Sequence, residues 1–185
     1  MSAGRSSSQA SLKSTNTPLS RLVGAVEAGE EVVITRSGRP VTRFEPLPKS
    51  PRTFLDTNVL VYGDDGKESA KQKTALDLIR VHRERRTGVV SLQILQEYFV
   101  AATRKLKVDA EIARNKVEIY SKFHVAEPSV TDILAAIDLH RLRGFSYYDA
   151  LVLRMAKQSG CRILLSEDMQ HGQDVDGVRI VNPFL

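Results

Sequence analysis

The chain has 185 residues, of which 42% are hydrophobic and 26% charged, a composition typical of one folded domain with a smaller module beside it. No run approaches the roughly 20 consecutive apolar residues of a membrane span, the serine-rich amino end has no apolar stretch of the signal-peptide kind, and a single cysteine excludes an internal disulfide. We therefore expect a folded cytoplasmic protein with no membrane partner, in which Cys161 serves packing only.

The formal net charge of +5 is concentrated near the amino end. Residues 1–52 hold 8 Lys and Arg against 4 Asp and Glu, or +4, whereas the remaining residues hold 19 against 18, or +1. A basic segment can attract nucleic acid without reading its sequence. A solubilising tail would have the same composition, so both interpretations stay open.

The first third of the chain divides into three segments by composition. Residues 1–16 are rich in serine and poor in apolar residues, which predicts a disordered arm. Residues 17–47 contain periodic apolar positions, which predict a small folded module. Residues 48–52, between closely spaced prolines, predict a stiffened linker.

Within the module, the apolar pattern changes from helical to strand-like. Apolar residues recur at helical spacing from Leu19 to Val26, and Gly29 follows as a stop signal. The β-branched segment 32–35 and the segment 41–44 then flank a turn at Ser37-Gly38. The sequence thus predicts one helix followed by a β-hairpin.

Strands and helices alternate over residues 53–185. The pattern predicts strands at 53–61, 88–91, 162–166 and 178–181, with helices near 68–85, 92–105, 109–122, 129–143 and 147–159. Such alternation implies an α/β domain of three layers, with a central parallel sheet covered by helices on both faces. Ligands of these sheets bind beyond the carboxyl ends of the strands, where a functional site is therefore expected.

Two acidic residues stand out in the first half of this domain. Asp56 interrupts an apolar stretch, where an unpaired carboxylate costs several kcal/mol unless a partner such as a metal ion neutralises it. Capping of a helix by Asp56 is the alternative. Glu97 lies at the edge of the apolar face of the 92–105 helix, where an ordinary solvated glutamate is the alternative.

Two further acidic residues lie in the second half. Asp149 is in the first turn of the 147–159 helix, where a favourable charge at the helix N-terminus is the alternative to a ligand role. Asp168 follows the 162–166 strand, where a turn aspartate is the alternative. The topology sends all four acids toward one sheet edge. Oxygen ligands there suit Mg²⁺ or Mn²⁺, which activate water and stabilise charge on a phosphodiester.

The motifs that carry these acids resemble the PIN domain, in particular the ribonuclease toxins of the VapC kind. The similar segments are FLDTNVLVY, SLQILQEYF, SYYDALV, ILLSEDMQHGQ and GVRIVNPF, in the family's order over residues 53–185. The resemblance implies an endoribonuclease that cuts RNA with Mg²⁺ and pairs as a homodimer. Carried over by motif, the metal-binding and catalytic residues are Asp56, Glu97, Asp149 and Asp168.

Several neighbours of these acids also match the family's pattern. Asn58, Ser146 and Ser166 resemble polar residues that orient ligands or water. Glu167 stands beside Asp168, and the sequence leaves open which of the two points inward.

The N-terminal module has a resemblance of its own. LSRLVGAVEAGEEVVITRSGRPVTRFEPL, within residues 17–47, resembles the core of Phd/YefM-type antitoxins, which bind operator DNA as dimers and hold a toxin through a C-terminal extension. Here serine-rich sequence replaces the family's first strand, and the PIN-like domain replaces the extension. The chain thus looks like a toxin fused to an antitoxin remnant, and DNA binding, self-inhibition and a separate antitoxin protein all stay open.

Other functions compete with this one. A DNA-binding transcriptional autoregulator or partner-binding module, with a masked or inactive PIN domain, is the main alternative. A phosphatase of the haloacid dehalogenase class would need a second aspartate where Asn58 stands, and the segment 63–69 lacks a P-loop's glycine and Ser/Thr. The four histidines lack ligand spacing, although His171 is near enough to Asp168 to contact substrate: His82, His124, His140 and His171.

Overall fold

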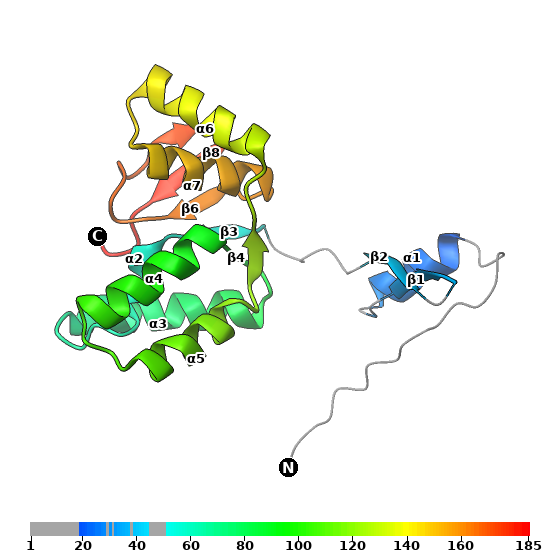
Figure 1. Cartoon of the computed structure of the whole chain (residues 1–185), viewed down its shortest axis with the longest axis horizontal. Helices are drawn as coiled ribbons and strands as arrows, with labels where there is room; N and C mark the ends of the chain where they lie inside the picture. The colour runs from blue at the N-terminus through cyan, green and yellow to red at the C-terminus, as the bar shows by residue number, and fades with distance from the viewer. Residues whose placement is uncertain (1–18, 29, 31, 38, 45–50) are drawn as a thin grey trace, which may run out of the picture. The chain divides into compact units, whose positions relative to one another are not determined.

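The computed structural model describes residues 19–28, 30, 32–37, 39–44 and 51–185 (Figure 1). The chain divides into two compact units, residues 1–47 and 48–185. The expected arm at 1–16, Gly29, Gly38 and the linker residues 48–50 lie outside the described residues.

The first unit contains the predicted helix and hairpin. Helix α1 spans Leu19–Glu27, and strands β1 (Val32–Arg36) and β2 (Arg39–Phe44) pair antiparallel with Val32 opposite Phe44. Val32 is buried, whereas Leu19 and Phe44 are exposed. These elements agree with the sequence, and the antitoxin-like identity of the unit stays a prediction.

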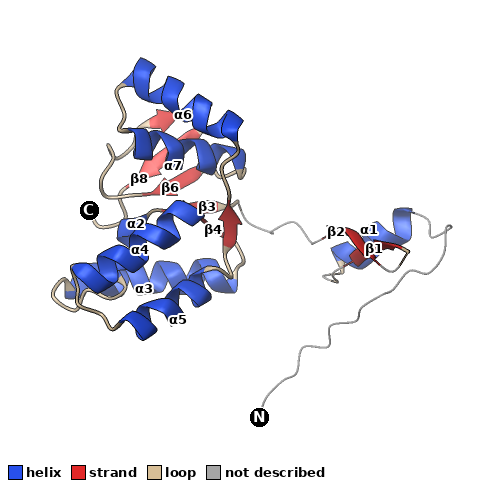
Figure 2. Ribbon diagram, viewed as in Figure 1, coloured by secondary structure: helices blue, strands red, loops and turns tan. Residues whose placement is uncertain are grey.

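The second unit is built on a six-stranded sheet of order β5-β4-β3-β6-β8-β7. All neighbouring pairs are parallel except β7 with β8. The strands are β3 (Thr53–Leu55), β4 (Gly88–Ser91), β5 (His124–Ala126), β6 (Ile163–Leu165), β7 (Asp174–Val175) and β8 (Val178–Val181). The predicted α/β class with a mostly parallel central sheet is confirmed, and Figure 2 shows its strands among the helices.

The helices fall into two groups, α6 with α7 and α3 with α4 and α5 (Figure 1). Their bounds lie close to the predicted ones: α3 (Ser69–Glu84), α4 (Leu92–Arg104), α5 (Ala110–Tyr120), α6 (Val130–Arg143) and α7 (Tyr147–Gln158). Apolar side chains from both groups and from the central strands form one core, including the fully buried Phe54, Leu164 and Ile180.

The predicted strand over 53–61 is wrong beyond its first three residues. Strand β3 ends at Leu55, and helix α2 spans Thr57–Tyr62. Asp56 causes the change, because its backbone is extended and its side chain accepts a hydrogen bond from the amide of Thr57, as in a helix N-cap. A short apolar run does not distinguish a buried strand from a buried helix, and Val59 and Leu60 are fully buried in α2.

Two short strands have no counterpart in the sequence prediction. Strands β5 and β7 have 3 and 2 residues, too few to produce a periodic pattern.

Cys161 is buried, and burial raises the pKa of its thiol to about 12, which fits a packing role. None of the helices in the part of the chain described above is long and apolar enough to cross a membrane.

Candidate functional site

The carboxyl ends of β3 and β6 meet at one edge of the sheet. Leu55 of β3 lies opposite Leu165 of β6, and the amide of Asp56 donates to the Leu165 carbonyl at 3.0 Å. The residues that follow the two strands therefore lie side by side. Ser166, which is fully buried, donates from its hydroxyl to Asp56 Oδ2 at 2.6 Å.

Asp56 is the buried centre of this edge, with 7% of its surface exposed. Its other oxygen, Oδ1, accepts from the Thr57 amide at 2.7 Å. Burial raises the pKa of Asp56 to about 6, the hydrogen bonds from Ser166 and Thr57 oppose that rise, and the charges of Asp168 and Glu97 add to it. The carboxylates of Asp168 and Glu97 thus lie close enough to Asp56 to repel its charge.

The amide of Asn58 lies between two of these carboxylates. Its Nδ2 donates to Asp56 Oδ2 at 3.3 Å and to Asp168 Oδ2 at 3.2 Å, while its buried Oδ1 has no hydrogen-bond partner among the described residues. The Asp168 amide in turn donates to Ser166 Oγ at 3.2 Å. Asn58 and Ser166 therefore occupy the positions expected of orienting neighbours, joining residues 110 apart in the chain.

Glu97 reaches the same edge from helix α4. Its Oε2 accepts from the Thr57 hydroxyl at 2.6 Å, and its Oε1 accepts from Gln93 Nε2 at 2.7 Å. With both oxygens engaged, the carboxylate is held toward the start of α2. Thr57 and Gln93 were not predicted from the sequence, although Gln93 stands four residues before Glu97 and so on the same helix face.

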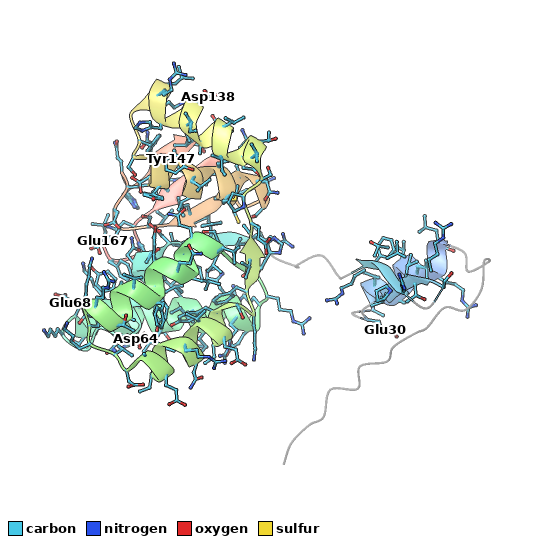
Figure 3. All side chains as sticks on the ribbon, viewed as in Figure 1. Glu30, Asp64, Glu68, Asp138, Tyr147 and Glu167 are labelled. Carbon is cyan, nitrogen blue, oxygen red and sulfur yellow. The ribbon has the colours of Figure 1, made fainter. Side chains whose placement is uncertain are left out.

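The structure distinguishes the adjacent acids after β6. Glu167 pairs with the ammonium of Lys71, which also donates to the Tyr62 hydroxyl at 3.0 Å. Figure 3 labels Glu167 on the loop that follows β6. Asp168 is turned instead toward Asn58 and Asp56. Of the two, Asp168 belongs to the acidic cluster.

Asp149 is placed differently from the other three acids. Ser146 is the N-cap of α7, where its hydroxyl donates to Asp149 Oδ2 at 2.7 Å and accepts from the Asp149 amide at 3.1 Å. Within residues 51–185 no hydrogen bond or ion pair joins Asp149 to Asp56, Glu97 or Asp168, and the charge of Asp149 is not among the causes of the raised pKa of Asp56. The geometry therefore matches the alternative of a favourable charge in the first turn of a helix, and a ligand role for Asp149 stays a prediction.

The donors at this edge suit a hard divalent cation. Among the described residues no set of three or more His, Cys, Asp or Glu side chains is arranged to hold a metal ion. Proteins, however, commonly bind Mg²⁺ through one or two carboxylates, with water and substrate phosphate completing its shell. Asp56 and Asp168 fit that pattern, because both are oxygen donors that share a single amide partner in Asn58.

A groove of about 950 Å³ begins at this cluster. Its walls come from α2 and α4, each with residues after it, and from the loop after β6: Thr57, Asn58, Val61, Tyr62, Asp65, Gln96, Glu97, Val100, Ala101, Arg104, Lys105, Leu106, Glu167 and Asp168. His171 does not line the groove, and its Nδ1 accepts from the Asn182 amide at 3.0 Å.

Comparisons with known proteins agree with this architecture. The PIN domain family matches residues 53–173. Similar solved structures include a toxin–antitoxin complex from Klebsiella pneumoniae (19% identity, TM-score 0.53, covering 71% of this chain and 97% of that one) and DNA-bound VapBC from Salmonella typhimurium (19%, 0.50, 71% and 97%). VapBC2 from Rickettsia felis, bound to a DNA fragment from their promoter, is similar at 16% identity and a TM-score of 0.51, covering 69% and 96%.

At these identities the solved structures show a shared fold. A search of curated proteins found no match. The family match, in contrast, spans more than half of the chain, from the first strand of the sheet to the loop beyond Asp168. This chain therefore belongs to the PIN domain family.

Proposed function

We propose that this chain is a metal-dependent endoribonuclease of toxin–antitoxin type, acting on RNA in the cytoplasm. The observation that carries the proposal is the buried carboxylate of Asp56, held beside Asp168 and Glu97 with its pKa raised to about 6. A buried carboxylate with a raised pKa and other carboxylates beside it, at the carboxyl edge of a parallel sheet, is typical of a cation-dependent site.

In this proposal Asp56 and Asp168 hold Mg²⁺ or Mn²⁺, with Glu97 and Asp149 as the further acids of the site. When bound, the ion supplies activation of water and stabilisation of charge on a phosphodiester. The protein's other side chains orient these acids. Asn58 and Ser166 fix the two aspartates, and Thr57 with Gln93 fixes Glu97.

The proposed partners follow from the neighbours and from the N-terminal unit. The similar solved structures are a toxin–antitoxin complex and assemblies bound to DNA. Residues 17–47 resemble an antitoxin core, so we include an antitoxin protein and operator DNA among the partners, and a homodimer as the assembly. Light scattering of the purified protein tests the dimer, and a monomer at all concentrations would contradict it.

The nuclease proposal is tested by incubating the purified chain with mixed cellular RNA and with DNA of matching sequences. We expect RNA fragments in Mg²⁺ and in Mn²⁺, no fragments in EDTA, and intact DNA throughout. Cutting that persists in EDTA would contradict the metal. An intact RNA pool under every condition, together with a mobility shift of an operator fragment, would favour the transcriptional autoregulator.

A further inference from the structure

The groove beside the acidic cluster has opposite charges along one face of helix α4. Arg104 is seven residues beyond Glu97, which is nearly two full turns, so the two side chains share a face and lie about 10 Å apart along the axis. Lys105 follows Arg104 and also lines the groove. The groove is therefore acidic near Glu97 and basic near Arg104, at two places along the same face of α4.

The two cations are available to a ligand. Arg104 and Lys105 are exposed, and neither forms an ion pair with any other described residue. Lys71, near the acidic part, is by contrast paired with Glu167. The remaining charged side chains of the groove are acidic, and none of them lies within ion-pair distance of Arg104 or Lys105.

Apolar and aromatic side chains also line the groove. Val100 and Ala101 line it from α4, and Val61 and Tyr62 line it from α2. The Tyr62 ring is held edge-on against Phe184, with a centroid separation of 4.8 Å. Apolar and aromatic walls with nearby cations are typical of surfaces that bind single strands, because bases stack on the walls and phosphates contact the cations.

We propose that this groove binds single-stranded RNA, with Arg104 and Lys105 contacting its phosphates on one side of the bond that the acidic cluster cuts. The inference rests on the proposed function and names its substrate class. A volume of about 950 Å³ accommodates a few nucleotides. The strand would pass over Val100 and Ala101 to reach Glu97.

The test measures binding without cleavage. A fluorescein-labelled 10-nucleotide RNA of mixed sequence is titrated in EDTA with wild type and with Arg104→Gln/Lys105→Gln. We expect the double variant to raise the Kd about tenfold, and to lower the dependence of log K on log salt by roughly 0.7 for each phosphate that the variant no longer binds. The matched control is Arg83→Gln/Arg85→Gln, which removes the same charge at the end of α3, near the amino edge of β4, and should bind like wild type.

A second arm measures cleavage in Mg²⁺. The groove variant should have a raised KM and a kcat within twofold of wild type, since both cations lie away from the acids. If wild type cuts nothing, the proposed function fails, while the EDTA titration still decides the groove. Equal RNA affinity in the groove variant and the control would overturn the inference. Unchanged RNA affinity in the groove variant, together with a loss of binding to an acidic amphipathic peptide, would also overturn the inference. The groove would then be a protein-docking surface.

Discussion

In metal-free buffer at pH 7.5, Asp56→Asn should unfold at a higher urea concentration than wild type, with a gain of up to about 3 kcal/mol in the free energy of unfolding. The native fold raises the pKa of Asp56 from 3.8 to about 6, so the ionised side chain destabilises the folded state. Asparagine removes the charge and keeps an oxygen to accept from the Thr57 amide.

The sign of this effect sets its pH window. Because the folded pKa is the higher one, the favourable state is fully present below about pH 4 and is lost as the pH rises through 6. The gain of the variant should therefore vanish at pH 4 and grow toward pH 7.5. Urea titrations across this range in EDTA measure it, with the exposed Asp77→Asn as a control expected to change little.

Adding Mg²⁺ supplies an independent check on the same pair of proteins. An ion that binds only the folded wild type stabilises it, and should leave Asp56→Asn unchanged. A variant less stable than wild type at pH 7.5 in EDTA would contradict the burial of an uncompensated charge at Asp56.

Lys116→Met should destabilise the domain by about 3 kcal/mol. The Lys116 ammonium pairs with Asp64, whose side chain is only 8% exposed, and the fully buried Tyr98 donates to the same carboxylate at 2.6 Å. This contact joins α5 and α4 to the loop after α2, where Figure 3 labels Asp64. Removing the ammonium leaves a buried carboxylate with one neutral donor.

A double variant separates charge from packing. Lys116→Met/Asp64→Asn removes both charges and keeps an oxygen for Tyr98, so urea unfolding should recover most of the stability that Lys116→Met removes. Arg80→Met, which breaks exposed pairs with Asp77 and Glu84, should cost at most about 1 kcal/mol. Equal losses in Lys116→Met and Arg80→Met would show that the Asp64 pair contributes no more than a surface pair.

The sequence could predict the α/β fold because its elements are long and strongly patterned. Helices α3, α4, α5 and α7 each bury an apolar face, so their positions are predictable to within a few residues. Helix α2 is not predictable in this way, since its six residues are as apolar as the strand before them. Only the cap formed by Asp56 separates the two, and capping is the alternative that the sequence leaves open at that residue.

The kind of site could be predicted from the sequence, but several of the contacts that form it could not. Parallel strands sent Asp56 and Asp168 to one edge, and the structure brings Glu97 to them through Thr57. The preference for Asp168 over Glu167 depends on Lys71, which lies 96 residues from Glu167 and forms no local motif with it. In the sequence Arg104 and Lys105 resemble ordinary basic residues at the end of a helix. Only the structure shows that they line the same groove as the acidic cluster.

The most direct test of the acidic cluster is the rate at which labelled RNA is cut in Mg²⁺ by wild type, Asp56→Asn and Glu167→Gln. Asp56→Asn should lose about 100-fold or more, as expected when a metal ligand is removed, although it is the more stable protein. Glu167→Gln should stay within a few-fold of wild type, because Glu167 faces Lys71. Full activity in Asp56→Asn, or a loss confined to Glu167→Gln, would contradict the assignment.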